Sequence, residues 1–551
     1  MVLRTLLQTL LDSDPARLRV IARQWNITLK ATRKADMAHE LADTLASGEV
    51  INDRLDQLTP DQRAALDDLL RRGGAIPWAI FTREWGEVRT LGAGRVEREE
   101  LWHEPVSPAE ALWYMGLVQR AFDGRADHSV EMAFIPEELR LYMPTPSPVE
   151  RAVPPEAPPP PQQMPGRESL ADDLVTAWAM RYLPEDLRQP LRTQLHPPAE
   201  ERLSLVERLS LEQGWLREHD DDLKPAASAI LEWLQADSWD QWSTLSEAWM
   251  ISEGWNDLAH VPGLGPDPTQ GWRYAPQATR RAFLDVLAAC QPDTWYNLDA
   301  FVAYVKTHAT DFLRPDGDYE TWAPRDAETD KPLRGFEVWE AVEGRLIVYL
   351  ITAPLSWLGL VDLGAPHGDA TPTAFRLSTA GAALVGSASP PTLEEPASVT
   401  VHPTGVCSVP ARRRYERFQL SRIADPLPSA DASVDAYRYR LTTSSLGRAR
   451  QQRIPLERII TFLKEAAGVS ELPAGLERAV QQAYQKQLGA ALKRRWLLRV
   501  SDPQILQIPA ILDLIDERLA PDLVSIRDDV ERERLDEVLA DSGILTEVED
   551  G

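Results

Sequence analysis

Cysteine is almost absent from this sequence, which has 2 cysteines, Cys290 and Cys407, among 551 residues. Two residues so far apart cannot form a disulfide framework, and this scarcity is typical of the reducing cytoplasm. No apolar run reaches roughly eighteen residues, so the sequence predicts no membrane span. The first residues predict an amphipathic helix rather than a signal peptide, because Asp12 and Asp14 interrupt the apolar stretch.

Positive charge is in deficit, since the formal net charge is −26 at pH 7. This charge opposes binding to nucleic acid or anionic lipid over the surface as a whole. Any contact with nucleic acid therefore requires a local basic patch, and the simplest reading of the acidity is solubility.

Several catalytic signatures are also missing. The segment "HVPGLGPDPT" has the glycines of a phosphate-binding loop but no lysine, and the sequence has no Asp-Glu-x-His motif. It has no serine nucleophile elbow and no histidine or cysteine spacing of a zinc site. We therefore expect no enzymatic activity, no cofactor and no metal. An enzyme that acts on nucleic acid through another motif remains an alternative.

Helices followed by two short strands recur along the chain. The segments around Leu112, Leu205 and Leu350 each show an apolar helix, a glycine, and a pair of strands. Gly116, Gly214 and Gly359 hold the matching turn position. A helix followed by a two-stranded wing is the winged-helix unit, a variant of helix-turn-helix.

These patterns predict a mainly α-helical chain with small β wings, in which tandem winged-helix domains precede a C-terminal α/β domain. The proline-rich stretches predict linkers. The expected divisions are a helical hairpin similar to SAP domains (1–50), a winged-helix domain (51–145), a linker (146–169), a winged-helix-like domain (170–270), a third winged-helix domain (271–386), a linker (387–398) and the α/β domain (399–551).

The segment "VTVHPTGVCSVP" contains both His402 and Cys407. A cysteine nucleophile needs a nearby base and a lowered pKa, and the turn "PTG" would bring the two residues together. Alternating Val399 and Val401, however, indicate a β-hairpin. We interpret the segment as a hairpin in which Cys407 packs as a small apolar residue.

The best candidate binding residues are arginines between 412 and 453, where ten arginines accompany only four acids. Interleaved tyrosines suit a surface that contacts phosphates and stacks bases. The alternative is that these arginines pair with acidic faces of the same protein or of a partner. The candidates are Arg412, Arg413, Arg414, Arg417, Arg438, Arg440, Arg448, Arg450 and Arg453, with Lys493, Arg494 and Arg495 as an extension and Lys30, Arg33 and Lys34 as a weaker group in the N-terminal hairpin.

About the last quarter of the chain resembles the N-terminal domain of the XPB repair helicase, as found in bacterial helicase-associated proteins. The resemblance covers residues 398–545 and rests on "VHPTGVCSVP", "YRYRLTTSSLGRARQQRIPLERIITFLKEAAGVSELPAGLERAV" and "WLLRVSDPQILQIPAILD". Because the helicase motor is absent, the resemblance implies an accessory protein in DNA repair or transcription. Its expected partners are an XPB-like helicase and DNA, and its expected location is the cytoplasm or the nucleoid.

A stand-alone winged-helix transcriptional regulator is the main alternative. It would need a basic recognition helix in one winged-helix unit. The candidate helices "PAEALWYMGLVQRAF" and "VWEAVEGRLIVYLIT" are apolar, which favours buried positions.

Overall fold

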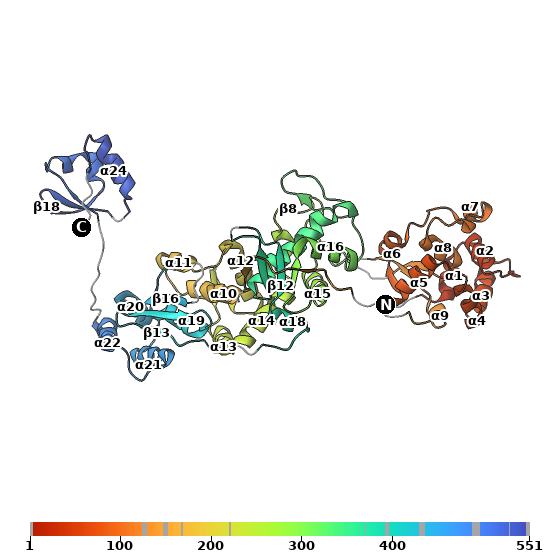
Figure 1. The fold of residues 1–551 in the computed structure, drawn as a ribbon, viewed down its shortest axis with the longest axis horizontal. Coiled ribbons are helices and arrows are strands. Elements are labelled where there is room, and N and C mark those ends of the chain that lie inside the picture. Colours follow the sequence, from red (N-terminus) through yellow and green to blue (C-terminus); the bar gives the residue numbers. More distant parts are fainter. Residues whose placement is uncertain are drawn as a thin grey trace.

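The computed structural model describes residues 4–123, 129–146, 152–166, 169–219, 222–368, 370–391, 396–428, 436–486, 496–527 and 529–546 (Figure 1). About 49% of the chain is helix and 14% is strand, so it is a mixed α/β protein with small sheets. Buried side chains form four large clusters. These clusters define an N-terminal unit (6–139), a middle unit (170–382), a sheet unit (399–483) and a C-terminal unit (500–539).

The N-terminal unit is mostly helical (Figure 1). Its elements are α1 (Leu6–Asp12), α2 (Pro15–Gln24), α3 (Lys34–Leu45), α4 (Gly48–Leu55), α5 (Pro60–Arg71), β1 (Ala75–Pro77), α6 (Trp78–Trp85), α7 (Ala93–Arg98), η1 (Leu101–His103), α8 (Pro108–Met115), β2 (Gln119–Phe122), β3 (Glu131–Phe134) and α9 (Glu137–Arg140). The three strands form an antiparallel sheet in the order β1-β3-β2.

Polar caps set the helix starts here. The Thr59 side chain accepts a hydrogen bond from the backbone of Gln62, whose side chain accepts one in return, so α5 begins with a capping box. Ser107 caps α8 in the same position before a proline. Both starts have the hydroxyl cap followed by proline that is typical of helix N-termini.

The expected boundary between residues 1–50 and 51–145 is wrong, because one core spans both segments. Buried side chains from α2, α3, α5 and α8 belong to a single cluster, and α2 packs directly on α8. The helical hairpin exists as α2 and α3, but it buries its apolar face against the following helices. An amphipathic hairpin this short cannot bury that face alone.

The middle unit contains the largest core. Its elements are β4 (Glu156–Ala157), β5 (Gln162–Met164), α10 (Ser169–Met180), α11 (Glu185–Arg192), α12 (Ala199–Glu212), β6 (Leu216–His219), β7 (Asp222–Pro225), α13 (Ala227–Gln235), α14 (Ser238–Ile251), η2 (Asp257–His260), β8 (Leu264–Gly265), α15 (Pro276–Leu287), β9 (Trp295–Asn297), α16 (Leu298–His308), β10 (Arg325–Asp326), η3 (Phe336–Val338), the π-helical turns η4 (Glu340–Gly344) and η5 (Ile351–Leu355) on either side of α17 (Arg345–Leu350), β11 (Val361–Ala365), β12 (Ala374–Leu377) and α18 (Thr379–Leu384).

The proline-rich segment is not a free linker along its whole length. Strand β4 pairs with β9, and β5 pairs with β11, so the segment supplies both edges of a five-stranded sheet in the order β4-β9-β12-β11-β5. Extended proline-rich chain suits sheet edges, where a missing N–H is tolerated. The sequence interpretation missed this because the pairing partners lie more than a hundred residues away.

The expected boundary at residue 270 is also wrong. One continuous cluster includes Trp178 and Trp249 from the earlier segment and Phe283 and Phe375 from the later one. The predicted turn glycines are confirmed: Gly116, Gly214 and Gly359 have φ of 75°, 71° and 73°, the left-handed region that other residues avoid.

The sheet unit and the C-terminal unit have separate cores, so the single domain expected at 399–551 is wrong. The sheet unit consists of β13 (Thr400–Val401), β14 (Val406–Pro410), α19 (Arg414–Ile423), β15 (Asp425–Pro426), β16 (Ala436–Arg440), α20 (Thr443–Gln451), α21 (Leu456–Ala467) and α22 (Leu476–Lys486), and the C-terminal unit of β17 (Leu497–Arg499), η6 (Ile505–Gln507), α23 (Pro509–Leu512), β18 (Ile515–Ala520), β19 (Leu523–Ile526) and α24 (Arg532–Asp541).

The strand orders are β13-β14-β16-β15 and β17-β19-β18. Residues Ile515–Ala520 form strand β18, which pairs with β19. Its charged side chains gave no apolar alternation, so only the pairing partner reveals the strand.

Substitution of Gly116 tests how closely this turn packs against Ile21 of α2. A Cβ atom there would lie 3.1 Å from Cδ1 of Ile21, whereas nothing lies within 4 Å of a Cβ at Gly214. We expect Gly116→Ala to lower the free energy of unfolding more than Gly214→Ala, which suffers only the left-handed strain of about 1–2 kcal/mol. Thermal unfolding of both variants measures the difference.

The variant Ile21→Val provides the matched control, because it removes Cδ1, the nearest of the three Ile21 atoms that a Cβ at Gly116 would meet. It should destabilise the parent protein by about 0.5–1.5 kcal/mol and cost less in the Gly116→Ala background. Equal costs in the two backgrounds would contradict the contact.

Candidate nucleic-acid or partner interface

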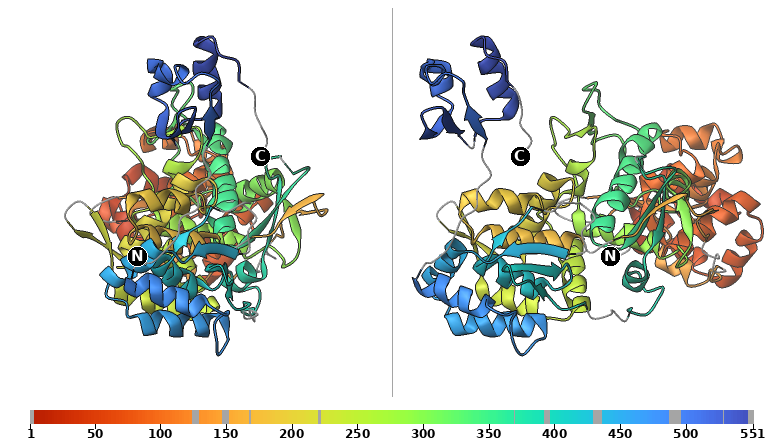
Figure 2. Two further views of the ribbon diagram at one scale, coloured as in Figure 1. Left: turned by 90° about the vertical axis from the view of Figure 1, so that its left-hand side faces the viewer. Right: turned by 60° about the vertical axis from the view of Figure 1, so that its left-hand side comes forward.

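The arginines between 412 and 453 do not form one surface. In the described residues some are buried in the protein, some pair with acids of the same chain, and some face solvent. The difference follows from their elements, since α19 packs against α10 of the middle unit while β16 keeps one open side. Figure 2 shows this unit, in cyan and blue, beside the yellow helices of the middle unit.

Arg414 and Arg417 are buried, with 1% of each side chain exposed. Nε of Arg414 donates to the Asp172 carboxylate at 3.3 Å, and its Nη1 donates to Oε1 of Gln241 at 3.1 Å. Nη1 of Arg417 donates to the backbone carbonyl of Asp172 at 2.9 Å. These two candidates therefore hold the sheet unit to α10 and are not available to nucleic acid.

Burial also governs the other groups of this contact. Burial raises the pKa of Asp172, while the positive charges of Arg414 and Arg417 act in the opposite direction. The Arg417 guanidinium lies 3.4 Å from the ring centroid of Tyr437, and its Nη2 donates to the Thr176 hydroxyl. A cation–π contact of this kind is strongest away from water.

Two further arginines bind groups of their own unit. Arg448 pairs with Asp425, whose carboxylate also accepts a hydrogen bond from the Thr442 hydroxyl at 2.6 Å. Arg413 pairs with Glu416 at 3.5 Å and donates to the carbonyl oxygen of Pro396 at 2.9 Å. Both side chains are partly buried, so we assign them a role in stabilising the fold rather than in binding a partner.

Arg438 and Arg440 are the arginines that face outward from the sheet. They alternate along β16 with Tyr437 and Tyr439, which are buried in the core of the unit. Such alternation is typical of a strand with one buried side, and both arginines are exposed. Among the described residues, neither makes an ion pair, so the open side of the sheet presents two neighbouring positive charges.

Arg450 lies in the last turn of α20, and Arg453 follows that helix. Arg450 is exposed and its Nη1 is 3.5 Å from the carbonyl oxygen of Tyr484. Arg453 is exposed and has a φ of 58°. The predicted extension by Lys493, Arg494 and Arg495 lies outside the described residues.

A groove of about 650 Å³ opens where the sheet unit meets the middle unit. Arg412, Arg413 and Tyr415 line one side, and Trp239 lines the other. Trp239 stacks at a tilt on Trp242, with 4.7 Å between the ring centroids, so it is held in place at the rim. No sequence pattern marks Trp239 as a groove residue, because only the fold places it beside the arginines.

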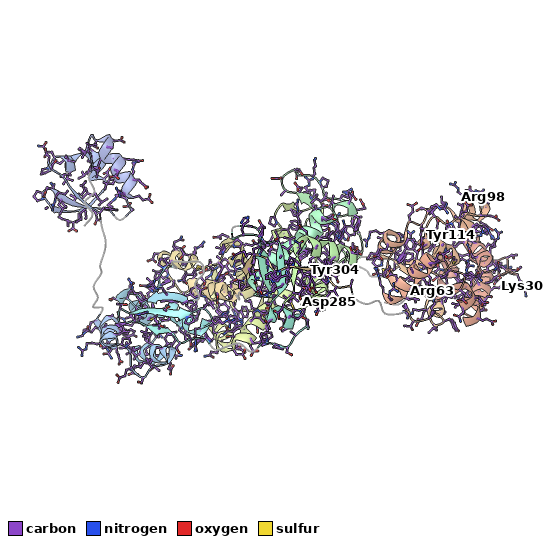
Figure 3. All side chains as sticks on the ribbon, viewed as in Figure 1. Lys30, Arg63, Arg98, Tyr114, Asp285 and Tyr304 are labelled. Atoms are coloured by element: carbon purple, nitrogen blue, oxygen red, sulfur yellow. The ribbon has the colours of Figure 1, made fainter. Side chains whose placement is uncertain are left out.

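The basic residues of the N-terminal hairpin lie together between α2 and α3. Lys30, Arg33 and Lys34 are all exposed, and Figure 3 shows Lys30 at the outer edge of the N-terminal unit. The Glu40 carboxylate accepts hydrogen bonds from the backbone N–H groups of Lys30 and Ala31, which fixes the turn. These backbone bonds also lower the pKa of Glu40.

Cys407 and His402 do not form a catalytic pair. Cys407 is fully buried on β14, whereas His402 is exposed in the turn between β13 and β14. Burial raises the pKa of Cys407 to about 12, which removes the thiolate that a nucleophile requires. The hairpin interpretation is confirmed.

Other acidic and histidine side chains give no metal centre in the described part of the chain, where no group of three or more His, Cys, Asp or Glu converges. His219 lies at the end of β6, opposite Asp222 of β7. Within the same residues, no helix has the length and apolar character to cross a bilayer.

Comparison with known proteins adds no assignment. No protein-family model matches the chain, and no curated protein matches its sequence.

Both thiols provide a test of burial. Burial raises the pKa of Cys290 and of Cys407 to about 12, so we expect neither to react with Ellman's reagent in the native protein. An exposed cysteine reacts faster as the pH rises through about 8.5. The thiols of the native protein should instead stay unreactive between pH 7 and 9. Both should react once the protein is unfolded in guanidinium. One fast native thiol would contradict the burial and reopen the nucleophile interpretation.

The contact of Asp172 with Arg414 provides a second test. Asp172→Asn removes a buried charge and leaves two buried cations, which should lower the free energy of unfolding by about 3–5 kcal/mol. Asp285→Asn is the matched control, because Asp285 is exposed on α15 (Figure 3) and should change stability by less than about 0.5 kcal/mol. For both variants, urea unfolding with hydrogen exchange followed in α19 measures the change in the free energy of unfolding.

A double variant distinguishes this pairing from general damage. If Asp172 and Arg414 stabilise each other, Asp172→Asn with Arg414→Gln should cost less than the sum of the single variants. Strict additivity would show that the two side chains act independently.

Proposed function

We propose that this protein is a non-enzymatic accessory protein that acts beside an XPB-like helicase in DNA repair or transcription. The observation that carries the proposal is the outward-facing pair Arg438 and Arg440, on a sheet that buried contacts hold against the middle unit. The same sheet contains the motifs that resemble the helicase-associated family. A rigid sheet with two exposed arginines suits docking to phosphates or to a partner's carboxylates.

The helical units support a framework role. The elements α5, β1, α6, α8, β2 and β3 follow the order helix, strand, helix, helix, hairpin, and α15 to β12 contain the same order. In both sheets the first strand pairs with the third, as in β1-β3-β2 and β9-β12-β11. We propose that these are winged-helix units.

Neither of these units supports sequence-specific reading. In DNA-binding proteins of this type, the third helix enters the major groove. Here α8 lies against α2, α5 and α6, and α17 with its flanking turns is almost entirely buried. A stand-alone regulator is therefore the weaker alternative, because it would have to expose one of these helices.

Contacts to DNA would be made through the phosphate backbone. The exposed cations that we propose for these contacts lie at three places: β16, the groove with Arg412, and the hairpin tip with Lys30. The net charge of −26 opposes binding elsewhere. Binding through a few phosphates is sensitive to salt and indifferent to sequence, which suits a protein that positions a helicase on many substrates.

The test combines the protein with the XPB-like helicase of the same cell. We expect a stable complex on size exclusion and a changed DNA-stimulated ATPase rate. The variant Arg438→Glu/Arg440→Glu should weaken the complex or DNA binding by at least about tenfold, since it replaces two attractive contacts by repulsion. Fluorescence anisotropy with single-stranded and forked DNA separates the two partners.

Arg458→Glu/Arg478→Glu is the control, because it makes the same charge change at exposed positions on α21 and α22. It should leave binding nearly unchanged, and both variants should melt like the parent. No complex, no ATPase effect and no DNA binding by the parent protein would overturn the proposal. Equal losses in both variants would assign binding to overall charge and not to β16.

A further inference from the structure

A cavity of about 340 Å³ lies in the N-terminal unit, and its lining includes none of the candidate binding residues described above. The end of α1, the start of α2, α7 with the segment before it, and the junction of α8 with β2 form its walls. Four arginines, Arg4, Arg17, Arg89 and Arg120, line it against two acids, Asp12 and Asp14. Its positive excess is unusual in so acidic a chain.

Three of the four arginines already have carboxylate partners. Arg4 pairs with Asp12, Arg120 pairs with Glu131, and Arg89 makes a bidentate pair with the buried Glu110, with Nη2 2.7 Å from Oε2. These charges are compensated inside the protein.

Arg17 is different. Among the described residues it makes no ion pair, and its one hydrogen bond runs from Nη2 to Oε1 of Gln119 at 2.9 Å. Its Nε is buried without an acceptor. The Asp14 carboxylate, three residues earlier, accepts a hydrogen bond from the N–H of Ala16 and caps α2.

The surroundings of Arg17 make its charge costly. The guanidinium lies 3.1 Å from the ring centroid of Trp113, which covers one face. Burial, and then the positive charge of Arg120, lower the pKa of Arg17 to about 9. Arg17 is partly buried, and a cation that loses part of its contact with water without gaining a counter-ion lowers the free energy of unfolding. An anion in the cavity would supply that counter-ion and the missing acceptor for the uncommitted N–H groups.

The remaining walls restrict the ligand. Val20, Leu91, Val96 and Trp113 give the cavity apolar sides beside the arginines. Its volume suits a small molecule with an apolar body and few polar groups, not a polymer. A planar guanidinium fork matches the two oxygens of a carboxylate or a phosphate.

We propose that this cavity binds a small organic anion, whose carboxylate or phosphate group pairs with Arg17 and whose apolar part lies against Val20, Leu91 and Val96. This site is independent of the helicase-docking surface, because it lies in another unit. Figure 3 labels Tyr114, which lines the cavity, and Arg98, which does not.

Isothermal titration calorimetry of the full chain tests the site with four probes. Benzoate and phenyl phosphate carry the two anionic groups on the same apolar ring, benzyl alcohol lacks the charge, and inorganic phosphate lacks the ring. We expect one or both aromatic anions to bind at least about tenfold more tightly than benzyl alcohol and inorganic phosphate. The tighter of the two identifies the anionic group.

Arg17→Met should weaken binding of the preferred anion at least about tenfold, whereas Arg98→Met, at an exposed position on α7, should not. Stability separates a binding role from a structural one. Arg17→Met removes an uncompensated cation and should melt no lower than the parent, while Arg89→Met leaves the Glu110 carboxylate without its partner and should melt lower.

The proposal is overturned if the parent protein binds neither aromatic anion at millimolar concentration, or if Arg17→Met binds the preferred anion as tightly as the parent does. It is also overturned if Arg17→Met melts as low as Arg89→Met, since Arg17 would then be a structural residue.

Discussion

The carboxylate and the carbonyl group of Asp172 accept hydrogen bonds from two buried arginines of α19. The position of the sheet unit depends on this contact. Every residue of α10, the helix that contains Asp172, is buried. A charge at such a depth is tolerated only when a partner compensates it. The sheet unit is therefore attached through a desolvated ionic contact, and Phe418 of α19 extends the apolar core of the middle unit beside it.

The same solution recurs through the middle unit. Asp173, the neighbour of Asp172, pairs with Arg202, and Asp257 pairs with Arg280, with both members of each pair buried. Arg280 also donates to the carbonyl oxygens of Trp249, Ser252 and Trp255, so one guanidinium satisfies three backbone acceptors. Several arginines of this acidic protein thus neutralise buried acids. The arginines that remain exposed are the ones that can bind DNA or another protein.

Local structure was predictable where a local cause exists. The caps at Thr59 and Ser107, the left-handed glycines such as Gly116, and the alternation in β16 all appear in the structure as the sequence indicates. Domain boundaries were not predictable, because they depend on which apolar faces meet. Strands β4 and β5 illustrate this: short proline-rich segments become strands only because a distant sheet offers them two free edges.

For the candidate surface, the sequence by itself determined the outward direction of Arg438 and Arg440, because alternation in a strand with buried Tyr437 and Tyr439 leaves no other choice. Only the tertiary structure decided that Arg414 and Arg417 are buried. Their spacing places them on one face of α19, but that face is equally suited to water or to a carboxylate. Asp172 decides between these two environments, although it lies 242 residues from Arg414 in the chain. An arginine is buried only where a partner such as this carboxylate compensates its charge.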